Sequence, residues 1–350
     1  MANYNYGRFL GQALESVLEQ TYKNYEVVVC DGGSTDESRN VLSAFASRHG
    51  QVRVLLEENR GSAEAILSAY QASRGEVICF LDSDDTFLPP KLEEIVKVFA
   101  ASPGAGFAVN RLTATDESLR MMRPVPVAAK LVSGWKAPEM PLRSPQMLWG
   151  MPPTTGISLR HAVADRVLPH LRGRKVFHDA VIQVLAPVIT PIVAIEYPLG
   201  LYRIHRGNTY ALRRFTLAGF ERMSHADTEL WRVWRSFIMT IAPNLPRDYP
   251  LPPEDGLSVL NYAHARRSGD PLASKLFREV ISGPWFASMP GPYRWFWRSA
   301  VFLPDWLFET GFNFIYGKGW AKNVISRVAS LLRTHRVTAE LISSTEPYRY

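Results

Sequence analysis

The sequence has little cysteine and no long apolar run, and each absence argues against a class of protein. Only two cysteines, Cys30 and Cys79, occur in 350 residues, and both lie in or at the end of apolar runs. Buried, reduced thiols therefore fit better than a disulfide framework. No stretch of about 18 uninterrupted apolar residues occurs, and the chain opens with polar and aromatic residues, which argues against a membrane-spanning helix and a signal peptide. The sequence therefore predicts a cytoplasmic protein.

Charge of one sign does not dominate the chain, because 40 Lys and Arg residues face 33 Asp and Glu residues. With 46% hydrophobic residues the chain is too apolar to be disordered, and its length suits one large α/β domain plus an extension. The net charge of +7 favours anionic partners, namely nucleotide phosphates, nucleic acid or an acidic membrane face. Because the basic residues are spread along the chain without a nucleic-acid-binding motif, nucleic acid is not expected as a partner.

Residues 8–110 alternate helical and strand patterns with short connections. The apolar run 27–30 has the length and composition of a strand buried on both faces, and a capping box from Ser34 to Glu37 is expected to open the next helix. This alternation predicts an α/β fold in which helices cover both faces of a mostly parallel sheet. Further strands are expected at 52–56, 77–81 and 107–109, and further helices at 9–18, 63–73 and 89–99.

The second half of the chain has a different pattern. Residues 123–153 are rich in proline, tryptophan and methionine without periodicity, and loops of this length are usually functional or mobile. Residues 211–350 have a helical pattern, which predicts a domain over 1–210 followed by a helical C-terminal region. Between them, strands are expected at 156–159 and 192–195, and helices at 161–168 and 179–185.

Three carboxylates, Asp82, Asp84 and Asp85, follow the apolar run 77–81 directly. Carboxylates so close at the end of a buried strand repel one another unless a cation offsets their charge, and Mg²⁺ or Mn²⁺ prefers oxygen ligands. A cation there would also stabilise a departing diphosphate. The alternative is a solvated acidic turn in which Asp85 caps the next helix.

A second polar segment, DGGSTD at residues 31–36, stands where the run 27–30 stops and a helix is expected to start. The carboxyl ends of strands form the ligand crevice of open α/β sheets, so Asp31 could accept a hydrogen bond from a base or ribose there. The alternative is that Asp31 and Ser34 only cap a helix.

Four segments in this order resemble glycosyltransferase family 2, whose members have the GT-A fold: Tyr4-Asn5, DGGSTD at 31–36, Asn59-Arg60-Gly61 and DSDD at 82–85. The resemblance covers roughly residues 2–210. It implies a nucleotide-binding half over 1–110 and an acceptor half over 111–210.

The resemblance also implies roles for single residues in binding a nucleotide-activated sugar. Tyr4 would pack on the nucleobase beside Asn5, and Asp31 would hold the edge of the base. Asp82 would lie near the ribose, and Asp84 would ligate Mg²⁺ or Mn²⁺.

Two later segments are similar to further motifs of the family. Asp179 matches the acid that deprotonates the acceptor hydroxyl in inverting transfer, although His178 stands where an acidic residue usually precedes it. In the Tyr-Arg-Ile-His segment at 202–205, Arg203 would favour the phosphates and His205 would reach the metal or diphosphate. The alternatives are a helix N-cap role for Asp179 and an ordinary surface position for His205.

One departure concerns the first strand of the sheet. The family begins with an apolar strand before Tyr4-Asn5, whereas only Met1, Ala2 and Asn3 precede that pair here. The central first strand is therefore expected to be missing, so that either the true start lies upstream or the chain lacks a core element.

Aromatic and basic residues mix over 284–320. Such a mixture could lie at a membrane interface, where a lipid-linked acceptor would be found, which predicts a protein that is peripheral on the inner face of the membrane. Equally, these aromatic residues could form a helical core.

Taken together, the motifs predict an inverting glycosyltransferase that moves a sugar from a nucleoside diphosphate sugar, with a UDP-sugar favoured, to a hydroxyl of a saccharide or lipid-linked acceptor. Bacterial surface polysaccharide or glycolipid synthesis is the expected setting. One alternative is a nucleotidyltransferase, but the basic, glycine-rich loop that such enzymes use to grip a triphosphate is not visible. The other is a non-catalytic binding protein derived from the same fold.

Overall fold

The structure is a computed structural model that describes residues 1–125, 131, 151–174, 178–205, 207–208, 229–230, 232–241, 258–282, 286 and 291–316. Much of the acceptor half, including most of 123–153, and residues 211–228 of the expected helical region lie outside these ranges. The chain forms two compact units, one of Met1–His205 with Met223–Ser258, the other of Arg206–Arg222 with Val259–Tyr350. The division at residue 210 into two domains stays a prediction.

The first unit begins with a three-stranded parallel sheet in the order β1-β2-β3. Its strands are β1 (Ala2–Asn3), β2 (Val27–Asp31) and β3 (Val52–Leu56). Asn3 pairs with Asp31 in register, so the expectation that the first strand is missing is corrected: a two-residue strand is present and pairs with β2. Two residues have too little apolar pattern to predict a strand.

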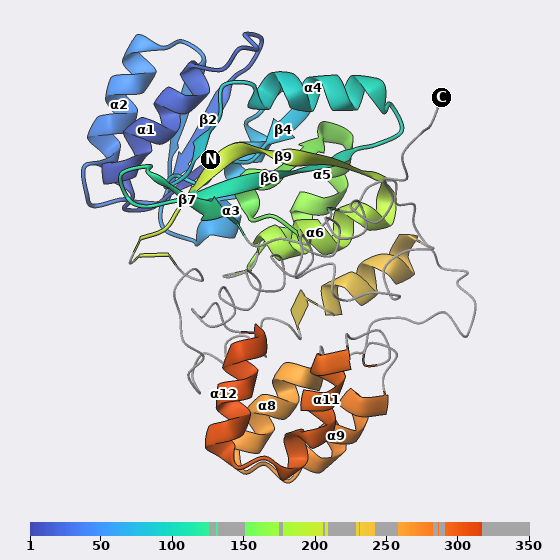
Figure 1. The fold of residues 1–350 in the computed structure, drawn as a ribbon. Helices are drawn as coiled ribbons and strands as arrows, with labels where there is room; N and C mark the ends of the chain where they lie inside the picture. Colours follow the sequence, from blue (N-terminus) through green and yellow to red (C-terminus); the bar gives the residue numbers. More distant parts are fainter. Residues whose placement is uncertain are drawn as a thin grey trace, which may run out of the picture. The chain divides into compact units, whose positions relative to one another are not determined.

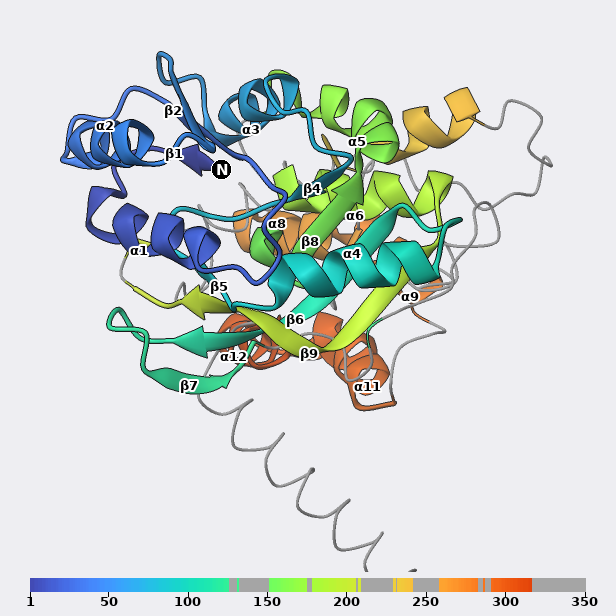
Figure 2. The same ribbon diagram turned by 90° about the horizontal axis from the view of Figure 1, so that it is seen from above.

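Helices cover both faces of this sheet, as the apolar run of β2 predicts. Val27 and Val29 face α1 (Gly7–Leu18) and α2 (Ser38–Arg48), and share a core with Leu10, Leu14 and Leu42 of these helices. The opposite face of β2 packs on α3 (Ser62–Gln71), where Val28 and Cys30 meet Ala65 and Ala69. Figure 2 shows α1 and α2 on one side of β2 and α3 on the other.

A second, six-stranded sheet has the order β4-β8-β6-β9-β5, with β7 paired to β6. Three of the seven strand pairs among the described residues are parallel and four are antiparallel, so the parallel pairing expected for the first half holds for β1-β2-β3, whereas the second sheet is mixed. An apolar run reports burial on both faces but carries no sign of the direction of its neighbours. The strands are β4 (Val77–Cys79), β5 (Thr86–Phe87), β6 (Phe107–Thr115), β7 (Met121–Pro124), β8 (Ile157–Arg160) and β9 (Ile192–Arg203).

Helices also cover both faces of the second sheet (Figure 1). Ala108 of β6 packs on α4 (Lys91–Ala101), whereas its neighbours Phe107 and Val109 face the core that contains α5 (His161–Val167) and α6 (His178–Ile189). Short 3₁₀ turns, η3 (Thr154–Gly156) and η4 (Leu168–Leu171), precede β8 and follow α5. The α/β class predicted from the sequence is therefore confirmed.

The second unit is helical where it is described. Its elements are α8 (Ser258–Ser268), α9 (Ala273–Ser282), α11 (Gly291–Ser299), the 3₁₀ turn η5 (Ala300–Phe302) and α12 (Asp305–Tyr316). Aromatic side chains form its core: Tyr262, Phe296, Trp297, Phe308 and Phe312. Among the helices within the described ranges, none is both long and apolar enough to cross a bilayer.

Candidate functional site

The three aspartates that follow β4 come together in space. One carboxylate oxygen from each of Asp82, Asp84 and Asp85 lies within 4.8 Å of the other two. The amide of Asp85 donates to the carbonyl of Asp82 at 3.1 Å, which closes the turn between β4 and β5. Among the described residues, these three aspartates are the side chains of ligand type whose oxygen atoms lie close enough together to bind one cation.

The electrostatics of this turn favour a bound cation. Burial, followed by the charges of Asp84 and Asp179, raises the pKa of Asp82 above its ordinary value. Burial, followed by Asp84 and Asp82, raises the pKa of Asp85 well above its ordinary value. Such shifts mean that the negative charges destabilise one another, and a divalent cation with a preference for oxygen ligands would offset them. The donor set therefore fits Mg²⁺ or Mn²⁺.

His205 lies against Asp84, with 2.9 Å between its Nε2 atom and Oδ2 of the carboxylate. The imidazole is buried, and its ring centroid lies 5.7 Å from that of Tyr6 and 4.8 Å from that of Phe9. The alternative of an ordinary surface histidine is therefore wrong. Its role as a metal ligand stays a prediction, and the observed contact places it where it would orient Asp84.

Arg203, at the end of β9, forms hydrogen bonds to residues 82–85, which we call the aspartate turn. Its backbone amide donates to Oδ1 of Asp85 at 2.9 Å, and its Nε donates to the carbonyl of Asp84 at 2.7 Å. Its Nη1 donates to the side chain of Gln12 and to the carbonyl of Glu117. The side chain is almost fully buried. Its predicted contact with phosphates stays a prediction, and the observed contacts give it a positioning role.

Asp85 is not a helix cap, which corrects that alternative. Its carboxylate is fully buried and accepts hydrogen bonds from Thr155 Oγ1 and the amide of Arg203. The next helix, α4, begins only at Lys91. Asp85 therefore ties the turn to η3 and β9.

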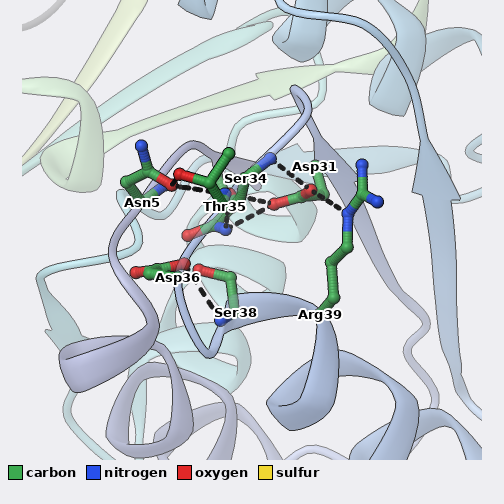
Figure 3. A network of polar contacts seen from close by, with 8 residues as sticks. Asn5, Asp31, Ser34, Thr35, Asp36, Ser38 and Arg39 are labelled. Atoms are coloured by element: carbon green, nitrogen blue, oxygen red, sulfur yellow. Dashed lines mark hydrogen bonds and ion pairs between the residues drawn. The ribbon is translucent and has the colours of Figure 1, made fainter.

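Asp31 ends β2 and lies at the centre of a second polar network, shown in Figure 3. Its carboxylate is fully buried and accepts hydrogen bonds from Asn3 Nδ2 at 2.7 Å and from the Ser34 amide at 3.0 Å. Ser34 Oγ also donates to it, and Arg39 Nε lies 3.7 Å away. The binding of a nucleobase by Asp31 stays a prediction.

The Tyr4-Asn5 pair lies beside the DGGSTD turn. Asn5 has a left-handed φ of 59°, and its Oδ1 accepts a hydrogen bond from the Thr35 amide at 2.8 Å. Its own amide donates to Ser34 Oγ at 2.8 Å (Figure 3). Tyr4 is 46% exposed, so its ring is open to a ligand. The contacts of Asn5 hold the turn in shape.

The capping box expected at Ser34 and Glu37 is wrong. Ser34 bonds to Asp31 instead, and α2 begins at Ser38 without a side-chain cap from Glu37. Asp36 supplies the acceptor: its carboxylate takes the Ser38 amide at 3.0 Å and the amide of Gly7, the first residue of α1, at 2.9 Å. One carboxylate thus joins the starts of two helices.

The four segments of the resemblance meet at the same edge of the first unit. The 59–61 connection lies on the DGGSTD turn, because a Cβ atom added to Gly33 would lie 3.4 Å from the Asn59 amide nitrogen. Ser83 Oγ donates to the carbonyl of Ala2 at 2.8 Å, which joins the aspartate turn to β1. Residues 81 positions apart in sequence thus meet at one edge of the unit.

Comparison with known proteins identifies this arrangement. Residues 1–157 match the model of the family described as glycosyl transferase family 2. An uncharacterized glycosyltransferase of Nostoc sp. is 30% identical over 232 residues, which cover 66% of this chain and 71% of that protein. The chain belongs to glycosyltransferase family 2. It is therefore a glycosyltransferase.

Two further proteins are similar to parts of this chain in sequence or in fold. A glucosyltransferase of Escherichia coli, WfgD, described as transferring from UDP-Glc to α-D-GlcNAc-diphosphoundecaprenol, is 37% identical over 94 residues, which cover 27% of this chain and 36% of WfgD. The crystal structure of residues 1–349 of S. aureus TarS with UDP-GlcNAc superposes with a TM-score of 0.56 at 15% identity, over 91% of each chain. This likeness confirms the GT-A fold.

Asp179 lies in the first turn of α6, on the side of the aspartate turn. Its charge contributes to the raised pKa of Asp82, so the two carboxylates are within electrostatic reach. Because α6 begins at His178, Asp179 is already inside the helix, and its Oδ1 accepts the hydrogen bond of the next amide, Ala180, at 2.9 Å. Its role as the base that deprotonates the acceptor stays a prediction for this family member.

His178, the departure from the family's motif, has partners of its own. Its Nε2 atom lies 3.0 Å from Thr154 Oγ1, and its Nδ1 atom lies 3.4 Å from Ser62 Oγ. Burial lowers the pKa of His178, against the opposing charge of Asp179. Burial therefore favours the neutral imidazole at this position.

The sequence did not single out two residues that border the aspartates. Burial, followed by the charges of Asp84 and Asp82, raises the pKa of Tyr6 to about 12, which places its phenol beside them. Thr155 donates to Asp85 and accepts from the Asp82 amide at 3.3 Å. The position of Tyr6 directly after the Tyr4-Asn5 pair could have indicated that it belongs to the site. No local sequence pattern indicates Thr155.

Replacing Arg203 with Lys is expected to lower both stability and transfer. One ammonium cannot keep the separate bonds to the Asp84 carbonyl, Gln12 and the Glu117 carbonyl, so about 3 kcal/mol of unfolding free energy should be lost. Urea denaturation measures this, with Arg120→Lys as the control at an exposed ion pair. Equal midpoints for the two variants would contradict the positioning role.

Proposed function

We propose that the chain transfers a sugar, with inversion, from a nucleoside diphosphate sugar to an acceptor hydroxyl, and that it requires Mg²⁺ or Mn²⁺. The observation that carries the proposal is the cluster of Asp82, Asp84 and Asp85, whose carboxylates lie within 4.8 Å of one another. The raised pKa values of Asp82 and Asp85 favour a cation at this point, and Asp179 is within electrostatic reach of Asp82.

In the proposed reaction each side chain has one task. Asp84, oriented by His205, would hold the cation together with Asp82, and the cation would offset the charge that develops on the leaving diphosphate. Asp179 would remove the proton of the acceptor hydroxyl as its oxygen attacks the anomeric carbon on the face opposite the diphosphate. Arg203 would keep the turn in place throughout.

The nucleotide would bind where the DGGSTD turn meets the Tyr4-Asn5 pair. Tyr4 is exposed enough for its ring to stack on a base. Asp31, whose buried carboxylate is held by Asn3 and Ser34, would accept a hydrogen bond from the edge of the base. We favour a UDP-sugar, since the related glucosyltransferase WfgD is described as using UDP-Glc.

The proposed acceptor is a saccharide or a lipid-linked sugar in bacterial surface polysaccharide or glycolipid synthesis. WfgD, which shares 37% identity over 94 residues, is described as acting on a diphosphoundecaprenol-linked sugar, and this supports the lipid-linked option. A cytoplasmic enzyme at the inner face of the membrane would meet such an acceptor. Residues 284–320 are proposed to provide the membrane contact.

A donor screen by nucleotide release tests reaction class and donor together. The full-length protein is incubated with each common UDP-, GDP- and dTDP-sugar, with Mn²⁺ or with chelator, and free nucleoside diphosphate is measured. We expect nucleotide release from one donor, which should be a UDP-sugar. The rate of release should fall at least a hundredfold in chelator. Undiminished release in chelator would contradict the metal-dependent mechanism, and metal-independent binding of UDP without release would indicate a non-catalytic binding protein.

A further inference from the structure

The aromatic residues of the second unit fall into two groups that the sequence does not separate. Phe296, Trp297, Phe308 and Phe312 form its buried core. A second group is exposed: Trp295 is 71%, Phe302 85% and Trp306 69% exposed, with Val301 and Leu307 beside them in the chain. We call these five residues, Trp295, Val301, Phe302, Trp306 and Leu307, the apolar corner. The helical core expected for this region therefore holds for the first group, and the membrane interface stays a prediction that concerns the second group.

The apolar corner is part of a rigidly held turn between α11 and α12. The guanidinium of Arg266, on α8, donates to the carbonyls of Ala300 and Leu303 and lies 3.2 Å from Oδ1 of Asp305. The next residue, Arg267, pairs with Glu309 of α12. The exposed aromatics thus stand on a fixed backbone, and burying them costs little conformational entropy beyond their own rotamers.

Two cationic side chains accompany the exposed Trp295 on α11. Arg294 and Arg298 are both exposed and lie one helical turn apart. Arg298 is also three residues from Trp295, so these two side chains share one face of α11, and Phe302 ends the 3₁₀ turn that follows the helix. Neither arginine pairs with a carboxylate among the described residues, and the Arg298 guanidinium lies 5.6 Å from the ring centroid of Phe286.

We propose that the apolar corner inserts into the headgroup boundary of an anionic lipid bilayer, with Arg294 and Arg298 at the lipid phosphates. Trp and Phe partition to this boundary, and arginine binds phosphate with paired N–H donors. A protein partner fits less well, because charged residues are depleted from the core of protein interfaces, whereas here two exposed arginines lie on the helix that carries Trp295. The proposal deepens the proposed function by naming the surface at which a lipid-linked acceptor would be met.

Vesicle flotation of the full-length protein tests the lipid contact without any sugar transfer. Wild-type protein is floated with phosphatidylcholine vesicles and with vesicles that also contain phosphatidylglycerol. We expect the partition coefficient to be at least thirtyfold higher for the anionic vesicles and to fall as salt is raised. Absence of binding to both kinds of vesicle would overturn the proposal.

Two double variants and one control assign the binding to these residues. Phe302→Ser with Trp306→Ser should weaken partition about a hundredfold, since each aromatic contributes about tenfold. Arg294→Gln with Arg298→Gln should lower the preference for anionic vesicles about thirtyfold. The control, Met121→Ser with Met122→Ser, removes two exposed apolar side chains of the first unit and should leave the partition coefficient unchanged for both kinds of vesicle.

Other occupants of the apolar corner give distinct results. If the Phe302/Trp306 variant binds vesicles like wild type, but light scattering shows that it has changed from dimer to monomer, the corner is an interface between copies of this chain and the proposal is wrong. UDP binding with Mn²⁺, measured by calorimetry, should be the same in wild type and in this variant. Loss of lipid binding with intact UDP binding therefore separates this proposal from the proposed transfer reaction.

Discussion

Replacing Asp84 with Asn should abolish sugar transfer and leave the fold intact. The substitution removes the charge that would hold the cation, while the amide oxygen can still contact His205 Nε2, as the carboxylate does at 2.9 Å. Loss of metal stabilisation of the leaving diphosphate should lower kcat by about a thousandfold or more, which corresponds to several kcal/mol of activation free energy. The measurement is nucleotide release under saturating donor and Mn²⁺, together with thermal unfolding.

The matched control for this variant is Glu93→Gln, which neutralises an exposed carboxylate on α4 that pairs with Lys97. It should have wild-type activity, and its midpoint of thermal unfolding should lie within about one or two degrees of that of the wild type. Calorimetry should show that Asp84→Asn binds UDP without the dependence on Mn²⁺ seen for wild type. Full activity of Asp84→Asn would refute the assignment of the cation to this turn.

Replacing Asp179 with Asn should lower kcat by about 10² to 10⁴, the range that a positioned general base contributes. The Asn side chain keeps an oxygen for the Ala180 amide, which Asp179 accepts at 2.9 Å, so the start of α6 is preserved. The affinity for UDP with Mn²⁺ should be unchanged, because the residue acts on the acceptor. Single-turnover transfer to a saturating acceptor measures the effect.

Asp165→Asn is the control for Asp179, since it neutralises a carboxylate on α5 that binds the hydroxyl of Tyr70 and lies outside the aspartate cluster. Any loss shared by both variants reflects stability. If Asp179→Asn lost affinity for UDP and kept kcat, the residue would belong to the donor site, and another group would have to accept the acceptor's proton.

Much of the first unit could be predicted because its signals are local. The run 27–30 contains enough β-branched and apolar residues to mark a strand, and α1 presents Leu10 and Leu14 at helical spacing. Strand direction could not be predicted in the same way. Whether β8 runs antiparallel between β4 and β6 depends on pairings about 50 to 80 residues apart, which leave no trace in a strand's own composition.

In the candidate site, too, the residues with local sequence signals could be predicted and those that depend on distant contacts could not. The roles of Asp82 and Asp84 could be predicted because carboxylates so close together after a buried strand repel one another unless a cation offsets their charge. The part played by Arg203 was not, because its partners Asp84 and Asp85 lie 119 and 118 residues earlier. The resemblance to the family drew attention to the arginine but suggested phosphate binding, whereas the structure shows it bonded to the protein.

The bonds from Arg203 also bear on when the enzyme becomes competent during synthesis. The family match ends at residue 157, and a nascent chain of that length already contains Asp82, Asp84 and Asp85. It lacks β9, which supplies the amide for Asp85, the guanidinium for the Asp84 carbonyl and, two residues on, His205. On the ribosome the metal site can therefore take its final shape only after residue 205 has left the exit tunnel, long after its acidic residues have emerged.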